Sequence, residues 1–266
     1  MKKIFFLILT LYSFTLSAQE KEIKKPEYVI IANNEIITKE KLGELGQQGL
    51  IKSMNKGVTE DKRNKLAKKF GDKIGDKIGD REFIIIIDLL TEKEKIEREN
   101  QKSKNDKKTV KEKNRNDELN LNINDSASEF TVQMIDGKKI KLSDLKGKVV
   151  LVNYWATWCA PCLMEFSEFP EKILEPFKDE KFILIAISIG ETKEKVELKM
   201  DKMKKYGVDF NVGINPEKEI WDKYATGAIP KSFLIDQNGI IKYISIGNSD
   251  GNVDKLATEI EKLLTE

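Results

Sequence analysis

The distribution of apolar residues divides the chain into three parts. Short apolar runs separated by turn residues occupy residues 27–91 and 126–266, whereas residues 92–118 consist almost entirely of charged and amide side chains. A segment this polar cannot bury enough apolar surface to offset the entropy of ordering it. The pattern therefore predicts a small α/β unit, a charged linker over residues 92–125, and a larger C-terminal domain. The linker is either disordered or a solvated helix with i,i+4 ion pairs, and both alternatives make it a spacer.

The N-terminal unit carries the signals of two strands and two helices. Residues 28–31 and 83–87 are apolar runs of strand length. One helical pattern follows Thr38, which suits a helix N-cap, and a second follows Thr59. Strands and helices in this order predict a small α/β fold of unknown role.

The C-terminal domain shows a regular succession of strands and helices. An Asp-Gly pair at residues 136–137 predicts a hairpin, and residues 149–155 and 182–189 are apolar on both faces, as is typical of central strands in a sheet covered by helices. Two helical patterns, a closing hairpin and a final helix occupy residues 161–177, 192–206, 232–246 and 252–264. The pattern predicts a compact α/β domain with a mixed sheet.

The first 18 residues have the features of a secretory signal peptide. Lys2 and Lys3 precede an uncharged stretch of thirteen residues, 4–16, and Ala18 precedes a polar turn. The apolar stretch is shorter than the roughly 20 residues of a membrane-spanning helix. A buried helix of a cytosolic domain is the alternative. Cleavage near Ala18 predicts a soluble periplasmic or otherwise extracytoplasmic protein, in a compartment where disulfides form.

The composition excludes several kinds of chemistry. The chain has 47 Lys and Arg against 45 Asp and Glu, two cysteines and no histidine. Without imidazole there is no Ser-His or Cys-His nucleophile pair and no His-ligated zinc or haem, and two cysteines cannot complete a structural zinc site. A net charge of +2 gives no reason to expect nucleic acid as a partner. We therefore expect chemistry that runs on thiols, carboxylates, amines or hydroxyls, with no metal and no cofactor.

The two cysteines, Cys159 and Cys162, stand where a buried strand gives way to a helix. The first turn of a helix has free N–H groups and a partial positive charge, so a thiol there ionises more readily, and the thiolate is the species that attacks a disulfide. Cys162 is close enough to close a disulfide with Cys159 and release a captured partner. Pro161 suits an early helix position, where its missing N–H had no partner.

Two other roles for the cysteine pair are weaker. A structural disulfide across two intervening residues closes a short loop and constrains the unfolded chain little. A peroxide-reducing cysteine needs a cationic or hydrogen-bonding pocket, and no such motif surrounds Cys159. We therefore interpret Cys159 and Cys162 as a catalytic, redox-active disulfide.

Three motifs cover most of residues 126–266. They are Leu-Ser-Asp-Leu-Lys-Gly-Lys-Val-Val at 142–150, Asn-Tyr-Trp-Ala-Thr-Trp-Cys-Ala-Pro-Cys at 153–162, and Gly-Ala-Ile-Pro at 227–230 before Phe-Leu-Ile-Asp at 233–236. Together they resemble the TlpA/ResA group of thioredoxin-like proteins, which are extracytoplasmic thiol-disulfide oxidoreductases. The resemblance implies a thioredoxin-like mixed sheet flanked by helices.

The resemblance also implies a cis peptide bond before Pro230, lying against the cysteines and shaping a substrate groove. A trans bond is the commoner state of X-Pro bonds overall. Trp158 is expected to shield the thiols and contact partners, whereas Trp155 is expected in the core. The expected groove residues are Trp158, Ala160, Pro161, Ile229, Pro230 and Lys231.

In the similar proteins an acidic residue three positions after the second cysteine tunes thiol ionisation and relays protons. Glu165 occupies this position, one turn beyond Cys162 on the same helical face. Asn153 stands where cytoplasmic thioredoxins carry a buried aspartate, which makes Glu165 the main candidate for the catalytic base. The alternative is a solvated helix carboxylate.

Two positions depart from the family pattern. Ser167 replaces the usual proline two residues after the glutamate, and Pro170 follows three residues later, which predicts a shifted kink in the active-site helix. Lys231 replaces the usual threonine after Pro230. A Lys231 side chain pointing toward Cys159 would lower the pKa of this thiol by about one unit, and otherwise the lysine is merely solvated.

The residues between the cysteines bear on the direction of the reaction. The most oxidising members of the fold over-stabilise the reduced thiolate, in part through a histidine there, and Ala160-Pro161 supplies none. We therefore expect a reductant. The resemblance implies a membrane thiol-electron transporter as its electron donor. It implies oxidised exported proteins as acceptors, including apocytochrome c during cytochrome c maturation.

A second hypothesis makes the chain an envelope binding or scaffold protein. In this hypothesis residues 27–91 recognise a partner and the thioredoxin fold presents a surface. The N-terminal unit loosely resembles plug-like modules attached to exported proteins of the Bacteroidetes type, through residues 28–31, 50–57 and 79–87. Disulfide reduction that depends on Cys159 distinguishes the enzyme from this alternative.

Overall fold

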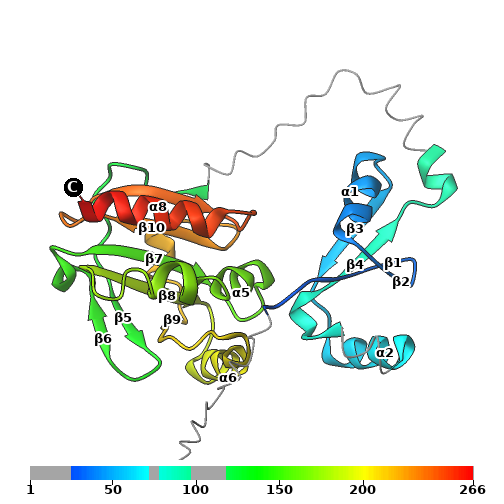
Figure 1. Cartoon of the computed structure of the whole chain (residues 1–266), viewed down its shortest axis with the longest axis horizontal. Helices are drawn as coiled ribbons and strands as arrows, with labels where there is room; N and C mark the ends of the chain where they lie inside the picture. Colours follow the sequence, from blue (N-terminus) through cyan, green and yellow to red (C-terminus); the bar gives the residue numbers. More distant parts are fainter. Residues whose placement is uncertain (1–24, 72–77, 97–117, 266) are drawn as a thin grey trace, which may run out of the picture.

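The computed structural model describes residues 25–71, 78–96 and 118–265, which form two sheets (Figure 1). The blue-to-cyan part carries a four-stranded sheet, and the green-to-red part carries a seven-stranded sheet. The predicted signal peptide, residues 1–18, lies outside the described residues. Within the described ranges, no helix combines the length and the apolar character needed to cross a membrane.

The smaller sheet has the strand order β2-β1-β4-β3. Its strands are β1 (Val29–Ala32), β2 (Glu35–Ile37), β3 (Ile51–Lys56) and β4 (Ile84–Leu89). β1 and β2 form a hairpin through Asn33 and Asn34, which take the positive φ angles of a tight turn, 47° and 65°. β1 also pairs in parallel with β4. The sequence pattern missed β2 and β3 because most of their side chains are exposed and show no apolar alternation.

Two capped helices complete the N-terminal unit. They are α1 (Lys39–Gln47) and α2 (Glu60–Phe70). The hydroxyl groups of Thr38 and Thr59 accept hydrogen bonds from the backbone N–H groups of Lys41 and Lys62. The predicted cap at Thr38 is therefore confirmed, and Thr59 caps α2 in the same way, because each threonine satisfies an N–H that the first helical turn leaves open.

The larger sheet has the order β11-β10-β7-β8-β9-β5-β6. β7, β8 and β9 run parallel, and the remaining neighbours pair antiparallel. The predicted mixed sheet is therefore confirmed. Its strands are β5 (Thr131–Met134), β6 (Lys139–Lys141), β7 (Val149–Trp155), β8 (Phe182–Ile189), β9 (Gly213–Asn215), β10 (Lys231–Ile235) and β11 (Ile241–Ile246).

Helices cover both faces of this sheet. They are α5 (Ala160–Phe166), α6 (Lys193–Met203), α7 (Trp221–Tyr224) and α8 (Asn252–Thr265). Leu151 and Trp155 of β7 enter one core cluster with side chains of α5, α6 and α8, whereas Val152 and Tyr154 enter a second cluster with α7. Every β7 side chain is buried, which explains why Asn153 is its only polar residue. β9 and α7 were not predicted, because they are too short to show a period.

The active-site helix is broken where the proline shift predicted a kink. The expected single helix over residues 161–177 is instead α5, which ends at Phe166, and a π-helical turn η4 (Pro170–Leu174). Pro170 has no N–H to continue an α-helical ladder. The hydroxyl of Ser167 donates to the carbonyl of Met164 (2.7 Å), which satisfies one of the last carbonyls of α5.

The C-terminal domain begins earlier than the sequence pattern indicated. Residues 118–125, assigned to the linker, bond to the domain: Leu119 bridges to Ala225, and the N–H groups of Asn120 and Asn124 donate to the carbonyls of Tyr224 and Ile241. The polar composition of this stretch concealed it, although its leucines pack against the α7-side core. Residues 97–117 of the predicted linker lie outside the described residues.

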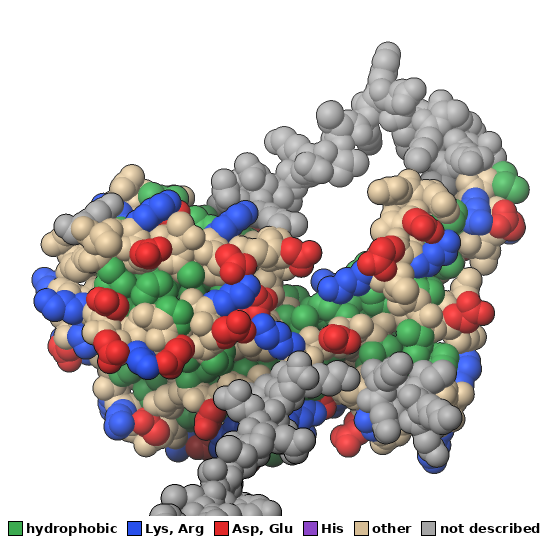
Figure 2. All heavy atoms as spheres, in the orientation of Figure 1, with side chains coloured by type: hydrophobic (Ala, Val, Ile, Leu, Met, Phe, Trp, Pro, Cys, Tyr) green, Lys and Arg blue, Asp and Glu red, His purple; other side chains and the backbone are tan. Residues whose placement is uncertain are grey.

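Charged and aromatic contacts join the two units. The carboxylate of Asp80 accepts hydrogen bonds from the hydroxyl of Tyr206 (2.9 Å) and the ammonium of Lys205 (3.0 Å). The ring of Phe83 meets that of Tyr206 edge-on, with centroids 6.1 Å apart. Acidic and basic side chains are interspersed over both units on the face that Figure 2 shows. The contacts between the two units are therefore specific hydrogen bonds, ion pairs and ring contacts.

Candidate active site

Cys159 and Cys162 lie at the junction of β7 and α5. Cys159 is the N-cap residue of α5, and its sulfur accepts a hydrogen bond from the backbone N–H of Cys162 (3.3 Å). The two residues form a disulfide with their Cα atoms 5.3 Å apart. The sulfur thus occupies the position where free N–H groups and the helix dipole stabilise a thiolate after reduction.

The two sulfurs differ in access. Cys159 is 4% exposed, whereas Cys162 has no exposed surface, so an incoming thiol or disulfide reaches Cys159. The side chain of Trp158, immediately before it, is 62% exposed and forms a large apolar surface beside the disulfide. Trp155 is fully buried as expected, and its ring centroid is 4.7 Å from the ring centroid of Phe166.

The loop that precedes β10 lies against Cys159. The Ile229–Pro230 peptide bond is cis, as the resemblance implied, and the Ile229 carbonyl oxygen is 3.7 Å from the Cys159 sulfur. Of the expected groove residues, Ile229 and Pro161 are partly exposed, whereas Ala160 and Pro230 are buried. The fold therefore brings the second and third sequence motifs together at the disulfide.

Lys231 is not part of this groove, which corrects both alternatives for it. Its side chain has no exposed surface, and its ammonium donates to the Glu118 carboxylate (3.1 Å) and to the carbonyls of Thr226 (2.9 Å) and Ala228 (2.6 Å). It lies over the ring of Trp221, on the α7 face of the sheet. Successive strand residues face opposite sides. Lys231 is therefore neither solvated nor aimed at the thiol.

The carboxyl group of Glu165 is buried in a network of amides and hydroxyls. It accepts hydrogen bonds from the side-chain amides of Asn153 (2.9 Å) and Asn252 (3.0 Å), and its residue is 1% exposed. The Asn153 amide also donates to Ser232, and the hydroxyl of Ser245 donates to Asn252. The alternative of a solvated helix carboxylate is therefore excluded. The sequence did not reveal Asn252, which is 87 positions away at the start of α8.

Burial raises the pKa of Glu165 to about 8, and the charge of Glu168 adds to the shift. The hydrogen bonds from Asn153 and Asn252 act in the opposite direction but do not outweigh the desolvation of a buried carboxylate. Glu165 is thus mostly protonated at neutral pH and is able to exchange a proton within the interior.

Comparison with known proteins bears on this site. A model described as the AhpC/TSA family matches residues 123–244. The thiol-disulfide oxidoreductase ResA of Bacillus subtilis (strain 168) is 37% identical over 120 residues, which cover 45% of this chain and 65% of that protein. ResA of Bacillus anthracis is 36% identical over 131 residues, covering 49% of this chain and 73% of that protein. The chain belongs to the ResA family of thiol-disulfide oxidoreductases.

Solved structures agree with this membership. A structure from Bacteroides thetaiotaomicron, described as a candidate protein disulfide isomerase, is 31% identical with a TM-score of 0.53, and the match covers 56% of this chain and 94% of that one. A candidate thiol:disulfide interchange protein DsbE from Chlorobium tepidum is 26% identical with a TM-score of 0.50, covering 54% and 99%. The ResA-like part is thus the C-terminal domain.

Glu191, which the sequence pattern did not single out, holds the loop in front of the ResA-like disulfide. Its carboxylate accepts hydrogen bonds from the backbone N–H and the hydroxyl of Thr157 (both 2.6 Å) and from Ser188 (2.9 Å), and it pairs with Lys195 (2.5 Å). Desolvation opposes ionisation, but these bonds, that of Lys195 foremost, lower the pKa of Glu191. An ionised, 4% exposed carboxylate therefore anchors the segment that carries Trp158 and Cys159.

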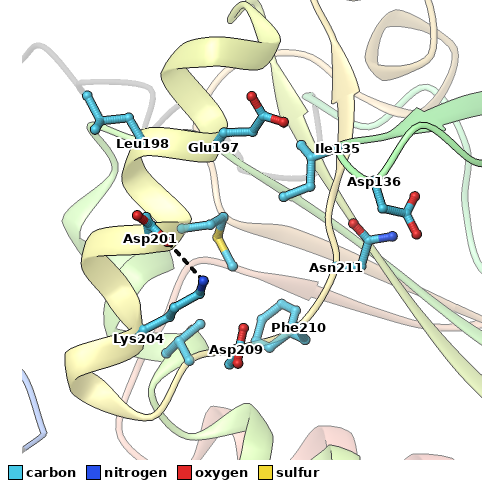
Figure 3. A pocket seen from close by; sticks show the side chains of 11 residues that line it. Ile135, Asp136, Glu197, Leu198, Asp201, Lys204, Asp209, Phe210 and Asn211 are labelled. Carbon is cyan, nitrogen blue, oxygen red and sulfur yellow. Dashed lines mark hydrogen bonds and ion pairs between the residues drawn. The ribbon is translucent and has the colours of Figure 1, made fainter.

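A separate cleft of about 610 Å³ lies between α6 and the segment around Phe210 (Figure 3). Neither cysteine lines it, and the ion pair of Asp201 with Lys204 stands at its edge. Among the described residues, no group of three or more Cys, Asp or Glu side chains has the arrangement of a metal site. The disulfide with its surroundings is therefore the candidate active site.

Replacement of Glu165 by Gln should flatten the pH dependence of stability. Between the ordinary pKa of 4.5 and the folded value of about 8, the folded protein keeps a proton that the unfolded chain releases. The wild type therefore loses stability as pH rises through this range, at up to about 1.4 kcal/mol per pH unit, and Glu165→Gln does not. Urea unfolding of the oxidised proteins at about pH 5, 6, 7 and 8 measures the difference. Parallel curves for wild type and Glu165→Gln would contradict it, and Glu175→Gln, which changes an exposed carboxylate paired with Lys178, is the control.

Replacement of Glu191 by Gln should destabilise the protein by about 1–3 kcal/mol at neutral pH, because it removes a charged acceptor from buried donors. Glu191 has a lowered pKa, so the loss is present above its ordinary pKa of 4.5 and shrinks as pH falls. Urea unfolding at neutral pH and at about pH 4 measures it. The exposed Glu197 on α6, which pairs with Lys193, supplies the control Glu197→Gln. Equal stability of the Glu191 and Glu197 variants would disprove the anchoring role.

Proposed function

We propose that this protein is an extracytoplasmic thiol-disulfide oxidoreductase that reduces disulfides of exported proteins. The observation that carries the proposal is the arrangement at the disulfide. Cys159 is the accessible sulfur, it caps α5, and the cis-proline loop lies 3.7 Å away at the Ile229 carbonyl. Membership of the ResA family supports the same reaction. The electrons reside in the Cys159–Cys162 pair itself, which needs no further cofactor for the exchange.

The reaction proceeds in two exchanges. In the reduced protein the Cys159 thiolate attacks one sulfur of the substrate disulfide, forms a mixed disulfide and releases the other substrate sulfur as a thiolate. The Cys162 thiolate then attacks the Cys159 sulfur, which restores the disulfide of the enzyme and releases the second substrate sulfur. Two electrons pass to the substrate, and two protons complete its thiols. The short span of the pair, with Cα atoms 5.3 Å apart, permits the second step.

Glu165 supplies a place for the proton that Cys162 must lose. Cys162 is fully buried, so bulk water does not reach its thiol directly. Glu165 lies three residues further on α5, and its pKa of about 8 is close to that of an ordinary thiol. Proton transfer between groups of similar pKa is efficient near neutral pH. We assign to the ionised fraction of Glu165, a minority at neutral pH, the role of base when Cys162 attacks, and to its protonated form the role of acid when the disulfide is reduced again.

The compartment and the partners follow from the same reasoning. The signal-peptide pattern of residues 1–18 supports export to an oxidising compartment. A dithiol reductant there needs an electron donor that reduces its disulfide after each reaction. A membrane thiol-electron transporter is the proposed donor. Oxidised exported proteins, with apocytochrome c among them, are the proposed acceptors. The exposed Trp158 offers such polypeptides an apolar contact beside the sulfur.

The reduced protein should reduce insulin disulfides, and Cys159→Ser should abolish this activity. The change removes the attacking sulfur while leaving the buried Cys162, which a protein substrate does not reach. The measurement is the turbidity of released insulin B chain with dithiothreitol as donor. Equal rates for wild type and Cys159→Ser would refute the enzyme assignment and favour the binding or scaffold alternative.

Cys162→Ser provides the complementary experiment, since it leaves the mixed disulfide unresolved. It should accumulate a covalent adduct with insulin that dithiothreitol releases, and the double variant Cys159→Ser/Cys162→Ser should form none. The same variant, expressed with its native export signal, identifies physiological partners by mass spectrometry of the trapped adducts.

The redox potential of the pair should lie nearer about −270 mV than about −120 mV. Ala160 and Pro161 contribute no histidine or cation, and the Lys231 ammonium is on the other face of the sheet. Equilibration with defined ratios of reduced and oxidised glutathione or thioredoxin measures the potential. A strongly oxidising value would overturn the assignment as a reductant.

A further inference from the structure

Beneath the cis-proline loop lies a buried ion pair. The ammonium of Lys231, with no exposed side-chain surface, is 3.1 Å from the carboxylate of Glu118, which is 21% exposed. Removing an ammonium from water is costly unless it is paired and its protons are bonded. A chain that carries this pair in place of two apolar residues thus gains little stability from it. The contacts of the pair show what it holds.

Each member of the pair binds the backbone of the loop. The Lys231 ammonium donates to the carbonyls of Thr226 (2.9 Å) and Ala228 (2.6 Å). The Glu118 carboxylate accepts from the N–H of Ala228 (3.1 Å), and the Glu118 carbonyl accepts from the N–H of Thr226 (2.7 Å). The N–H and carbonyl groups of both Thr226 and Ala228 are therefore fixed by the side chains of Lys231 and Glu118 and by the main-chain carbonyl of Glu118.

The glycine between these residues shows how closely the loop fits the pair. Gly227 has a φ of 75°, and a Cβ atom built on it would overlap the Glu118 carboxylate. Any side chain at this position would displace the carboxylate, whatever its chemistry. The loop thus passes directly over Glu118, which is held in place by the bridge of its neighbour Leu119 to Ala225.

The loop fixed in this way is the one that faces the reactive sulfur. Thr226, Gly227 and Ala228 are exposed, and the next carbonyl, that of Ile229, lies 3.7 Å from the Cys159 sulfur. We propose that the Glu118–Lys231 ion pair positions the cis-proline loop for binding of polypeptide disulfides. The proposal rests on the proposed function, since it concerns how that substrate class is held. Both members are positioning residues and touch no reacting atom.

The proposal separates two kinds of substrate. A polypeptide disulfide must fit between the loop and Trp158, so a loop held in one position avoids an ordering cost on binding. A small aromatic disulfide such as 5,5′-dithiobis(2-nitrobenzoic acid) needs only the Cys159 thiolate. Loss of the pair should therefore raise the KM for insulin and leave the reaction with the small disulfide unchanged.

The decisive variant is the double replacement Glu118→Gln/Lys231→Met in the full chain. Lys231→Met alone leaves a half-buried carboxylate without its ammonium and should lower the Tm by about 10 °C. The double variant removes both charges and should recover most of that Tm. It still lacks the ammonium that binds the carbonyls of Thr226 and Ala228, so we expect its KM for insulin to rise about tenfold. Its rate with the small disulfide should stay within about twofold of wild type.

Hydrogen–deuterium exchange of the peptide containing residues 226–230 gives a readout independent of activity. The Thr226 N–H donates to the main-chain carbonyl of Glu118 and the Ala228 N–H to its carboxylate. Both should exchange at least about tenfold faster in the double variant, because the ammonium that holds the carbonyls of these two residues is gone. Gly227→Ala keeps both charges but pushes the carboxylate aside, and it should show the same two effects. Lys242 lies on the neighbouring strand β11 and pairs with Asp236. The control variant Lys242→Met should match wild type in its KM for insulin and in the exchange of the loop amides.

A wild-type KM for insulin in both the double variant and Gly227→Ala would overturn the proposal. A parallel loss with insulin and the small disulfide would also overturn it, because the change would then act through Cys159. A wild type that does not reduce insulin would instead refute the proposed function. In that event unchanged exchange of the loop amides would still disprove positioning by the pair, and faster exchange would support it.

Discussion

The backbone N–H of Cys162 donates to the sulfur of Cys159 at the first turn of α5. The candidate active site depends on this contact, and the surrounding elements hold the two residues in place. A sulfur at a helix N-terminus is stabilised as an anion without any nearby cation. For α5 to begin directly after Cys159, β7 has to end at Trp155, and a short loop connects the two elements. All side chains of β7 are buried. The fully buried strand and the fully buried second cysteine are consequences of this geometry.

Three carboxylates around the disulfide illustrate how surroundings assign roles. Glu165 is bonded by neutral amides in a dry interior, so its pKa rises to about 8 and it can carry a proton. Glu191 is bonded by Lys195 and by donors of the Thr157 segment, so its pKa falls and it acts as a fixed anionic anchor. Glu118 is neutralised by a buried lysine beneath the cis-proline loop. The same functional group thus has three different surroundings, which is why we propose proton exchange for Glu165, loop anchoring for Glu191 and loop positioning for Glu118.

Contacts also link the two units. Asp80 and Phe83 of the N-terminal unit contact Tyr206, and Glu118, where the described C-terminal residues begin, bonds to the loop of the candidate active site. The two units share these contacts while the redox chemistry stays within residues 118–265. Both cysteines of the chain, Cys159 and Cys162, lie in the C-terminal domain.

The sequence by itself determined the fold class and the position of the two cysteines between a strand and a helix. Cys159 and Cys162 between an apolar strand and a helix, and the apolar strands of the sheet, are local patterns that a short window reveals. Only the tertiary structure decided where the polar side chains point and which partners they bind, because the residue type alone does not determine this. Lys231 turned to the face opposite the thiol because strand neighbours alternate, and Asn252 and Glu191 reached the site from distant positions. The short β9 and α7 were likewise set by pairing and packing, since they contain too few residues to show a period.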